Sequence, residues 1–385
     1  MGTRLRRFVA ELRQTPWSTL GRDFASNPRQ VLSQLGALPR RPGDPLRVSY
    51  GHAGFPDPPP GLDTIVYGGP LKYSYLQQHW PHAGRHFDII YAVSTSHRSD
   101  LERIARMAQR RGGKLVWNQN GVAYPAWHGP GWEQSNVPLS KALHAADHVL
   151  YQSNFCKLGA DRFLGERNGP WEILYNAVDT TRFTPAEVDP APGQLVLLLA
   201  GSHQQSYRLE SAARAVEILA RQSSDVRLLV TGRLSWTSDP SEATRSAHRL
   251  VAECGIADRV EFVGPYLQED APAMMRRAHV LLHTQYNDAC PSVVIEAMAC
   301  GLPVVYSHSG GTPELAGDDA GVGVPTELNW EQVVPPEPQA LAEAVLQVAE
   351  RRAQYAEAAR QRAVEHFDFQ LWLQRHREIF SELLS

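Results

Sequence analysis

Two carboxylates eight positions apart, Asp288 and Glu296, lie in the segment 288–311 (DACPSVVIEAMACGLPVVYSHSGG). The segment predicts a loop, a helix of about three turns, a loop, a strand and a final loop. Asp288 precedes this helix, and Glu296 lies one turn inside it. Because a carboxylate only accepts hydrogen bonds, such a pair suits the hydroxyl groups of a sugar or a ribose. Two solvated carboxylates beside a helix are nevertheless the common case, so the pair needs further support.

The N-terminus of the same helix offers a second kind of binding group. Pro291 suits the first turn, and the Gly-Leu-Pro sequence at 301–303 indicates the end of the helix. The free N–H groups near Ser292, Val293 and Val294 would face the preceding loop, where the helix dipole favours an anion such as a diphosphate. A sugar nucleotide carries both hydroxyl and phosphate groups.

This segment resembles the donor-site signature of GT-B retaining glycosyltransferases, especially glycosyltransferase family 4 (glycosyl transferases group 1). The signature is Glu, seven residues, Glu, then Ala-Met-Ala-x-Gly-x-Pro-Val-Val and Gly-Gly-x-x-Glu. Here Asp288 stands at the first acidic position and Glu296 at the second, and Gly310, Gly311 and Glu314 supply the last motif. Aspartate is one methylene shorter than the usual glutamate.

Other segments match the family in the same order along the chain. Residues 176–185 (NAVDTTRFTP) resemble the end of the N-terminal domain, and 260–264 (VEFVG), ending at Gly264, resemble the strand and glycine near the nucleotide base. Gly68 and Gly69 follow the first predicted strand, where many members carry a Gly-Gly that lets the backbone approach the donor phosphates. A glycine pair alone also fits a plain turn before a helix.

The resemblance implies a retaining glycosyltransferase that moves a sugar from a nucleotide diphosphate sugar to an acceptor hydroxyl, in glycan, polysaccharide or glycolipid biosynthesis. It implies no cofactor and no metal. Glu296 would hold the ribose, Asp288 and the N–H groups at the helix start would hold the sugar, and Gly311 and Glu314 are further donor-site candidates. Two alternatives stay open: a catalytically impaired GT-B protein that binds a nucleotide sugar or a partner, and a GT-B epimerase or phosphorylase.

The loop 201–208 (GSHQQSYR) departs from the family pattern, which commonly places an arginine and a lysine there to neutralise the diphosphate. Ser202 occupies the usual arginine position, whereas Arg208 lies where the lysine is expected and could bind phosphate with two nitrogens. The alternative is a solvated arginine at the start of a helix over 209–221. His203 is a further candidate, although an exposed loop histidine is more common.

A second departure lies after the predicted strand 114–117, where family members often carry a histidine near the transferred sugar. Asn120 falls near that position and could offer its amide to a sugar hydroxyl, but Asn120-Gly121 is equally an ordinary turn. Several aromatic or imidazole side chains follow, and they could form an acceptor wall or belong to the core: Tyr124, Trp127, His128 and Trp132.

The rest of the chain predicts α/β architecture of the GT-B kind: two doubly wound Rossmann-like domains facing a central cleft. Of the 385 residues 43% are hydrophobic, which suits two cores. Short apolar runs alternate with helical stretches, at 46–51, 88–93, 114–117 and 148–151 and again at 195–200, 226–231, 260–263, 279–283 and 303–306. We expect an N-terminal acceptor domain over 46–185, a proline-rich linker at 184–194 and a donor domain over 194–366. The helical tail 338–365 precedes a helix at 367–385 that crosses back to the first domain.

Residues 1–47 carry nine arginines but only three acidic side chains, in a chain whose net charge is −3. We expect residues 1–45 to be a helical extension, which either packs on the N-terminal domain or makes a peripheral contact with an anionic membrane beside a lipid-linked glycan acceptor. The near-neutral net charge disfavours nucleic-acid binding. Four unpaired cysteines, without a signal peptide or an apolar run long enough to span a bilayer, favour a cytoplasmic location.

Overall fold

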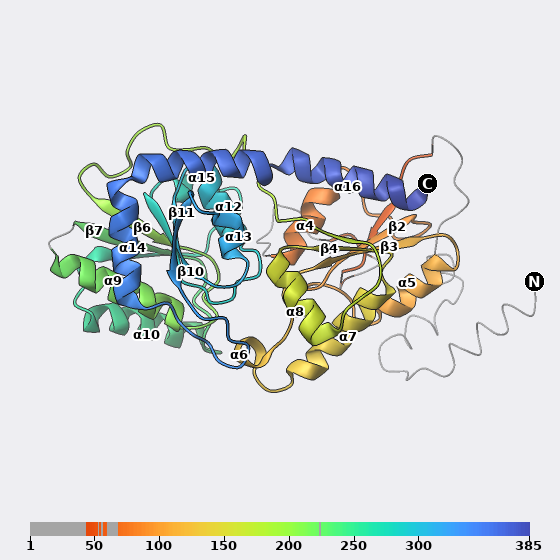
Figure 1. The fold of residues 1–385 in the computed structure, drawn as a ribbon, viewed down its shortest axis with the longest axis horizontal. Helices are drawn as coiled ribbons and strands as arrows, with labels where there is room; N and C mark the ends of the chain where they lie inside the picture. The colour runs from red at the N-terminus through yellow and green to blue at the C-terminus, as the bar shows by residue number, and fades with distance from the viewer. Residues whose placement is uncertain (1–43, 53, 55–56, 60–67, 223–224) are drawn as a thin grey trace, which may run out of the picture.

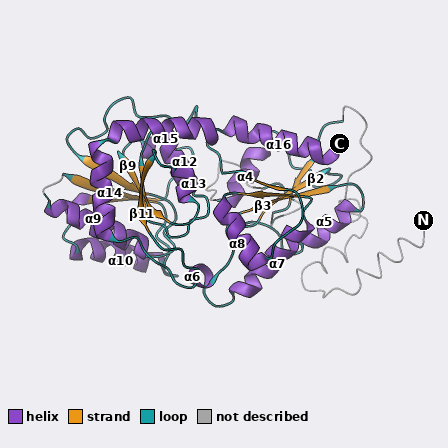
Figure 2. Ribbon diagram, in the orientation of Figure 1, coloured by secondary structure: helices purple, strands orange, loops and turns teal. Residues whose placement is uncertain are grey.

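The computed structural model describes residues 44–52, 54, 57–59, 68–222 and 225–385. The predicted extension 1–45, and with it the predicted membrane contact of 1–47, therefore lies almost wholly outside the described residues. The described chain forms two α/β domains side by side, each with a parallel sheet covered by helices (Figures 1 and 2). The predicted fold class is confirmed.

The N-terminal sheet has five parallel strands in the order β1-β2-β3-β4-β5. Strand β2 (IIYAV) is a continuous apolar run, because helices shield both faces of the sheet from water. One face packs on α4 and α16, and the other packs on α5, α7 and α8. The elements are β1 (Val48–Tyr50), α4 (Gly69–Leu76), β2 (Ile89–Val93), α5 (Leu101–Gln109), β3 (Lys114–Gln119), α6 (Pro125–His128), α7 (Trp132–Ala145), β4 (His148–Tyr151), α8 (Asn154–Leu164) and β5 (Trp171–Ile173).

The C-terminal sheet has six parallel strands in the order β11-β10-β9-β6-β7-β8. The order reverses between β6 and β9, and ligands of open α/β sheets bind beyond the carboxyl ends of strands at such a point. The elements are β6 (Leu195–Leu199), α9 (Tyr207–Arg221), β7 (Val226–Thr231), α10 (Pro240–Glu253), η1 (Ala257–Arg259), β8 (Val260–Gly264), α11 (Ala271–Met275), β9 (Val280–His283), α12 (Ser292–Ala299), β10 (Val304–His308), α13 (Thr312–Ala316), β11 (Gly321–Pro325), α14 (Pro338–Glu350), α15 (Arg352–His366) and α16 (Phe369–Leu384).

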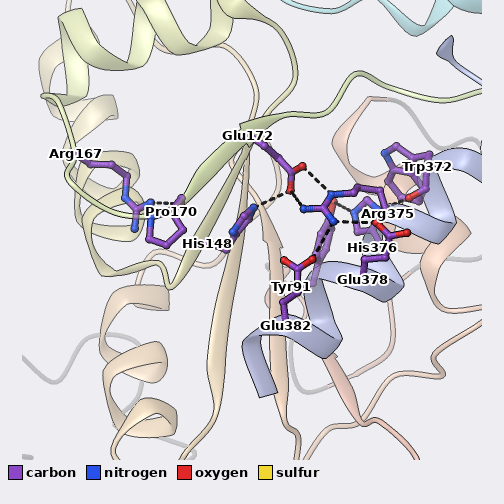
Figure 3. Close-up of polar contacts among 10 residues, drawn as sticks. All are labelled: Tyr91, His148, Arg167, Pro170, Glu172, Trp372, Arg375, His376, Glu378 and Glu382. Carbon is purple, nitrogen blue, oxygen red and sulfur yellow. Dashed lines mark hydrogen bonds and ion pairs between the residues drawn. The ribbon is translucent and has the colours of Figure 1, made fainter. Parts of the chain in front are cut away.

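Helix α16 crosses back from the C-terminal domain to the N-terminal sheet, as predicted (Figure 1). Its apolar face, which includes Trp372 and Phe380, is part of the N-terminal core. Arg375 reaches across to β5, where Nε donates to Oε2 of Glu172 at 2.8 Å, and the other Glu172 oxygen lies 3.0 Å from Nε2 of His148 (Figure 3). These contacts fasten the last helix to the domain in which the chain begins.

Four elements differ from the sequence expectation. Strands β5 and β11 were not predicted, and the tail 338–365 is two helices because Arg351 interrupts it with a φ of −123°. Helix α12 has eight residues, about two turns rather than three. It begins after Pro291, whose extended ψ of 112° makes it the N-cap, and it stops before Gly301, whose φ is +72°.

Candidate functional site

A cavity of about 470 Å³ lies between the two domains. Its walls are the loops that follow strands of both sheets. Ser94 follows β2 and Asn120 follows β3 on the N-terminal side, and Gly201, Gly232 and Gln285 follow β6, β7 and β9 on the other. The carboxyl ends of the two sheets thus face one another across the cavity, which is where open α/β sheets bind ligands.

The acidic pair predicted from sequence lies in this cavity. Asp288 and Glu296 both line it, although Glu296 is only 6% exposed. One oxygen of Glu296 accepts a hydrogen bond of 2.8 Å from Nε2 of Gln268. Burial raises the pKa of Glu296 to about 7, against the opposing effects of Gln268 and Arg182. Its second oxygen has no protein partner among the described residues and can accept from a ligand hydroxyl.

The start of α12 faces the cavity through Pro291, Ser292 and Val293. Val294 was a candidate for the same role, but its N–H donates to the backbone oxygen of Pro291 at 3.1 Å, and the residue does not line the cavity. Asn176, from the segment that precedes the linker, donates from Nδ2 to the backbone oxygen of Cys290 at 2.6 Å. This bond fixes the loop before α12 to the N-terminal side of the cavity.

His283, at the end of β9, was not identified from sequence. Its Nε2 lies 3.2 Å from Oδ2 of Asp288, and the ring is 1% exposed. Burial lowers the pKa of His283, so the ring is neutral at neutral pH even beside a carboxylate. The only sequence signal was a histidine that ends an apolar strand.

Arg208 also lines the cavity, but it is not a solvated arginine, and that alternative was wrong. Its side chain is buried, and its guanidinium donates to the backbone oxygens of Ala200 at 3.0 Å and Ser202 at 2.8 Å. The guanidinium therefore lies inside the loop after β6 and stabilises the conformation of that loop. Ser202 faces the cavity, whereas His203 is fully buried with Nε2 2.9 Å from the oxygen of Thr231. The expectation of an exposed loop histidine was wrong.

The predicted glycines divide between lining and packing roles. Gly68 lines the cavity with a φ of +57°, so a side chain there would be strained. Gly69 does not line it, and an added Cβ would lie 2.1 Å from Oγ1 of Thr95. Gly264 ends β8 beside the cavity residue Pro265 without lining the cavity itself. Gly68 and Gly264 thus serve positive-φ positions, whereas Gly69 makes room for the side chain of Thr95.

Gly311 and Glu314 lie behind the acidic loop rather than in the cavity. A Cβ on Gly311 would lie 2.0 Å from the backbone oxygen of Ala289. The carboxylate of Glu314 accepts from the backbone N–H groups of Asn154 at 2.8 Å and Phe155 at 2.9 Å, at the start of α8. Because α8 belongs to the N-terminal domain, Glu314 joins the two domains in this structure.

Asn120 lines the N-terminal wall, and its Oδ1 accepts from the N–H of Gly121 at 2.8 Å. It is thus a turn residue and a cavity residue at once. Tyr124, Trp127 and His128 also line the cavity, and Trp127 is 43% exposed. Trp132 instead packs its ring 5.4 Å from that of Phe163. The predicted aromatic cluster therefore lines the cavity except for the half-buried Trp132.

Lys72 is a second cavity residue that sequence reasoning missed. It lies in the first turns of α4, and its side chain is only 6% exposed. The residue lies three positions beyond the glycine pair, among apolar neighbours, and this position was its only sequence signal. The described residues contain no group of three or more His, Cys, Asp or Glu side chains suited to a metal ion.

A protein-family model matches the C-terminal domain. Residues 181–364 match the family model of Glycosyl transferases group 1. This match spans just under half of the chain, and it includes Arg208, Asp288 and Glu296. None of the N-terminal cavity wall up to Asn176 falls within it.

Curated relatives match less than half of the chain. A D-inositol 3-phosphate glycosyltransferase of Salinispora tropica is 30% identical over 167 residues, which are 38% of this chain and 34% of that protein. The enzyme of that name from Mycobacteroides abscessus is 32% identical over 163 residues, covering 40% of this chain and 35% of the relative. The chain thus spans about a third of the length of these relatives.

Solved structures share the whole two-domain arrangement. Sucrose-phosphate synthase from Thermosynechococcus elongatus has a TM-score of 0.63 at 20% identity, with 82% of this chain and 78% of that chain covered. Anabaena HepE in complex with UDP also has a TM-score of 0.63 at 20% identity, covering 81% of this chain and 82% of that chain. The protein therefore has the two-domain, Rossmann-like GT-B fold.

Proposed function

We propose that the protein is a metal-independent retaining glycosyltransferase of family 4. It moves a sugar from a nucleotide diphosphate sugar to an acceptor hydroxyl in glycan, polysaccharide or glycolipid biosynthesis, in the cytoplasm or at the cytoplasmic membrane face. The observation that carries this proposal is the pair Asp288 and Glu296 at the start of α12, inside a cavity shared by both domains. The group 1 match over 181–364 supports the same reaction class.

The donor occupies the C-terminal wall. The free oxygen of Glu296 accepts from a ribose hydroxyl, and the N–H groups at Ser292 and Val293 bind the diphosphate. Asp288 accepts from hydroxyls of the transferred sugar, with Nε2 of His283 3.2 Å from its carboxylate. The relatives are named for glycosyl transfer and HepE is described with UDP, so UDP-sugars are the first donors to test.

The acceptor occupies the N-terminal wall. Asn120 offers an amide, and the half-exposed ring of Trp127 can stack on the apolar face of a sugar. A carbohydrate or a lipid-linked glycan fits this wall. Of the described helices, none has the length and apolar character needed to cross a membrane.

The test combines binding and turnover. Thermal shift with UDP, GDP, ADP and their sugar conjugates should identify one base, since a ligand at 100 times its Kd stabilises by about 2.7 kcal/mol. The protein should then consume the sugar nucleotide of that base when an acceptor is present. NMR should show that the transferred sugar keeps the anomeric configuration it has in the donor. An inverted product would refute retention, and a failure of every nucleotide to bind would refute the whole proposal.

A second candidate function is nucleotide-sugar binding without transfer. It is favoured by Ser202, which lines the cavity where an arginine is common in the family. Tight binding of a sugar nucleotide, with neither transfer nor slow hydrolysis of the donor over many hours, would support this candidate against the first.

A further inference from the structure

Lys72 is a buried amine that lines the cavity and has no counterion among the described residues. It lines the cavity from the N-terminal domain, is 6% exposed, and forms no hydrogen bond or ion pair within the described part of the chain. Taking an ammonium out of water without a partner costs several kcal/mol. A side chain held in this way is suited to an anion that arrives with the substrate.

The groups around Lys72 do not neutralise it. Its nearest electrostatic neighbours are the thiols of Cys290, before α12, and Cys156, on α8. Burial raises the pKa of Cys156 to about 12 and that of Cys290 further, so both thiols stay protonated at neutral pH. His376 on α16 also interacts electrostatically with Lys72. Burial lowers the pKa of His376 to about 4, so its ring carries no charge at neutral pH. The amine itself has its pKa lowered to about 8, chiefly by burial.

The position of Lys72 relates it to the start of α12. Cys290 directly precedes Pro291, the N-cap of that helix, and Asn176 ties the same loop to the N-terminal side through Cys290 and Ser292. Lys72 and the start of α12 therefore line one cavity from opposite domains, and Cys290, beside that helix start, lies within electrostatic range of the amine. Two positive groups, one from each domain, converge where an anion would lie between the walls.

We propose that Lys72 binds the diphosphate of the donor from the N-terminal domain and supplies the second positive charge that Ser202 does not provide on the C-terminal loop. The inference rests on the proposed function and names a residue that the group 1 match does not cover. Because the anion would contact α12 on one domain and Lys72 on the other, donor binding would also hold the domains together. The ammonium would then stabilise the negative charge that grows on the leaving diphosphate.

Binding of UDP, uridine monophosphate and uridine to the wild type, Lys72→Met and Lys72→Arg proteins tests this by calorimetry, with GDP or ADP series if UDP does not bind. Lys72→Met should weaken UDP by at least about tenfold, the loss expected for one charged hydrogen bond, and should leave uridine nearly unchanged. Lys141→Met, which removes an exposed lysine on α7, should match the wild type. Methionine suits a buried site, so Lys72→Met should fold and melt at or above the wild-type temperature.

Proton uptake provides a readout that a merely structural lysine would not change. Near pH 8 the free amine is partly deprotonated, and a bound diphosphate should raise its pKa, so wild-type protein should take up protons as UDP binds. Lys72→Arg, which stays charged, should take up none beyond the background of Lys72→Met. The chain has four lysines, so ¹³C-labelled lysine side chains can report the titration of Lys72 directly.

The outcomes separate the inference from the proposed function. Wild-type protein that binds UDP, with Lys72→Met binding it equally well, overturns the inference alone. If Lys72→Met spares UDP but raises the KM only of phosphorylated or carboxylated acceptors, the anion belongs to the acceptor and the assignment to the donor is wrong. Wild-type protein that binds none of the nucleoside diphosphates overturns the proposed function as well.

Discussion

Replacing Glu296 by glutamine should stabilise the free protein and weaken the nucleotide complex at once. Burial raises the pKa of this carboxyl from an ordinary 4.5 to about 7. The Glu296 carboxyl ionises at a lower pH in the unfolded chain than in the folded protein. The free energy of unfolding therefore falls as the pH rises from about 4.5 to 7. The difference of about 2.5 pKa units corresponds to at most about 3 kcal/mol at pH 8.

Glutamine has no charge to desolvate and keeps an oxygen for the Nε2 of Gln268. We expect Glu296→Gln to raise the free energy of unfolding at pH 8 by about 1 to 3 kcal/mol and to change it little at pH 5. The matched control is Glu343→Gln on α14, where an exposed glutamate accepts from Gln339 at 2.8 Å and should give no comparable change. Calorimetric melting at both pH values measures the difference.

The same substitution should weaken the free nucleoside diphosphate by about 1.5 to 3 kcal/mol, because the charged hydrogen bond to ribose is lost. Between pH 6 and 7.5 wild-type affinity should rise relative to Glu296→Gln, since the hydroxyls favour the ionised carboxyl. The ratio of the two proteins' affinities cancels the effect of protonation of the nucleotide itself. A stability difference that is equal at both pH values would refute the raised pKa of Glu296, and unchanged nucleotide affinity would refute the assignment of this carboxylate to ribose.

Three further predictions concern the rest of the donor site. Asp288→Asn should spare binding of the free nucleotide but slow sugar transfer by at least about tenfold, and equal damage to both in calorimetry and turnover would show that the acidic pair has been divided wrongly. Arg208→Ala should slow donor cleavage by more than about tenfold, because the guanidinium lines the cavity and holds the oxygens of Ala200 and Ser202, and unchanged kinetics with intact circular dichroism would contradict this. Activity should persist in EDTA, because the helix start and cationic side chains supply the positive field, and a complete loss restored only by a divalent metal would contradict it.

The main features of both sheets could be predicted because strands buried on two faces are uninterrupted apolar runs. Such runs predicted β2, β4 and β6 to within one or two residues. The missed strands lack this signal. Strand β5 has three residues and begins at the exposed Trp171, and β11 contains two glycines in Gly-Val-Gly-Val-Pro, a sequence typical of a turn.

The candidate site was predictable where its residues are adjacent in sequence and was not where folding brings them together. Asp288 and the start of α12 belong to one short segment, so their spacing already placed them together. Gln268, which holds Glu296, comes from 28 positions upstream. The burial of Arg208 depends on backbone oxygens in the preceding loop, and no spacing rule distinguishes that arginine from a solvated one.

The contacts that hold the two domains together are chemically distinct from the groups that would bind substrate. Glu314 caps α8 and does not line the cavity. Trp330, which follows β11, inserts into the N-terminal core, where its ring stacks 5.0 Å from that of Phe155. Lys72 and the second oxygen of Glu296 take no part in these contacts and lie on opposite walls of the cavity. A donor that bound both would therefore add a further link between the domains to those made by Glu314 and Trp330.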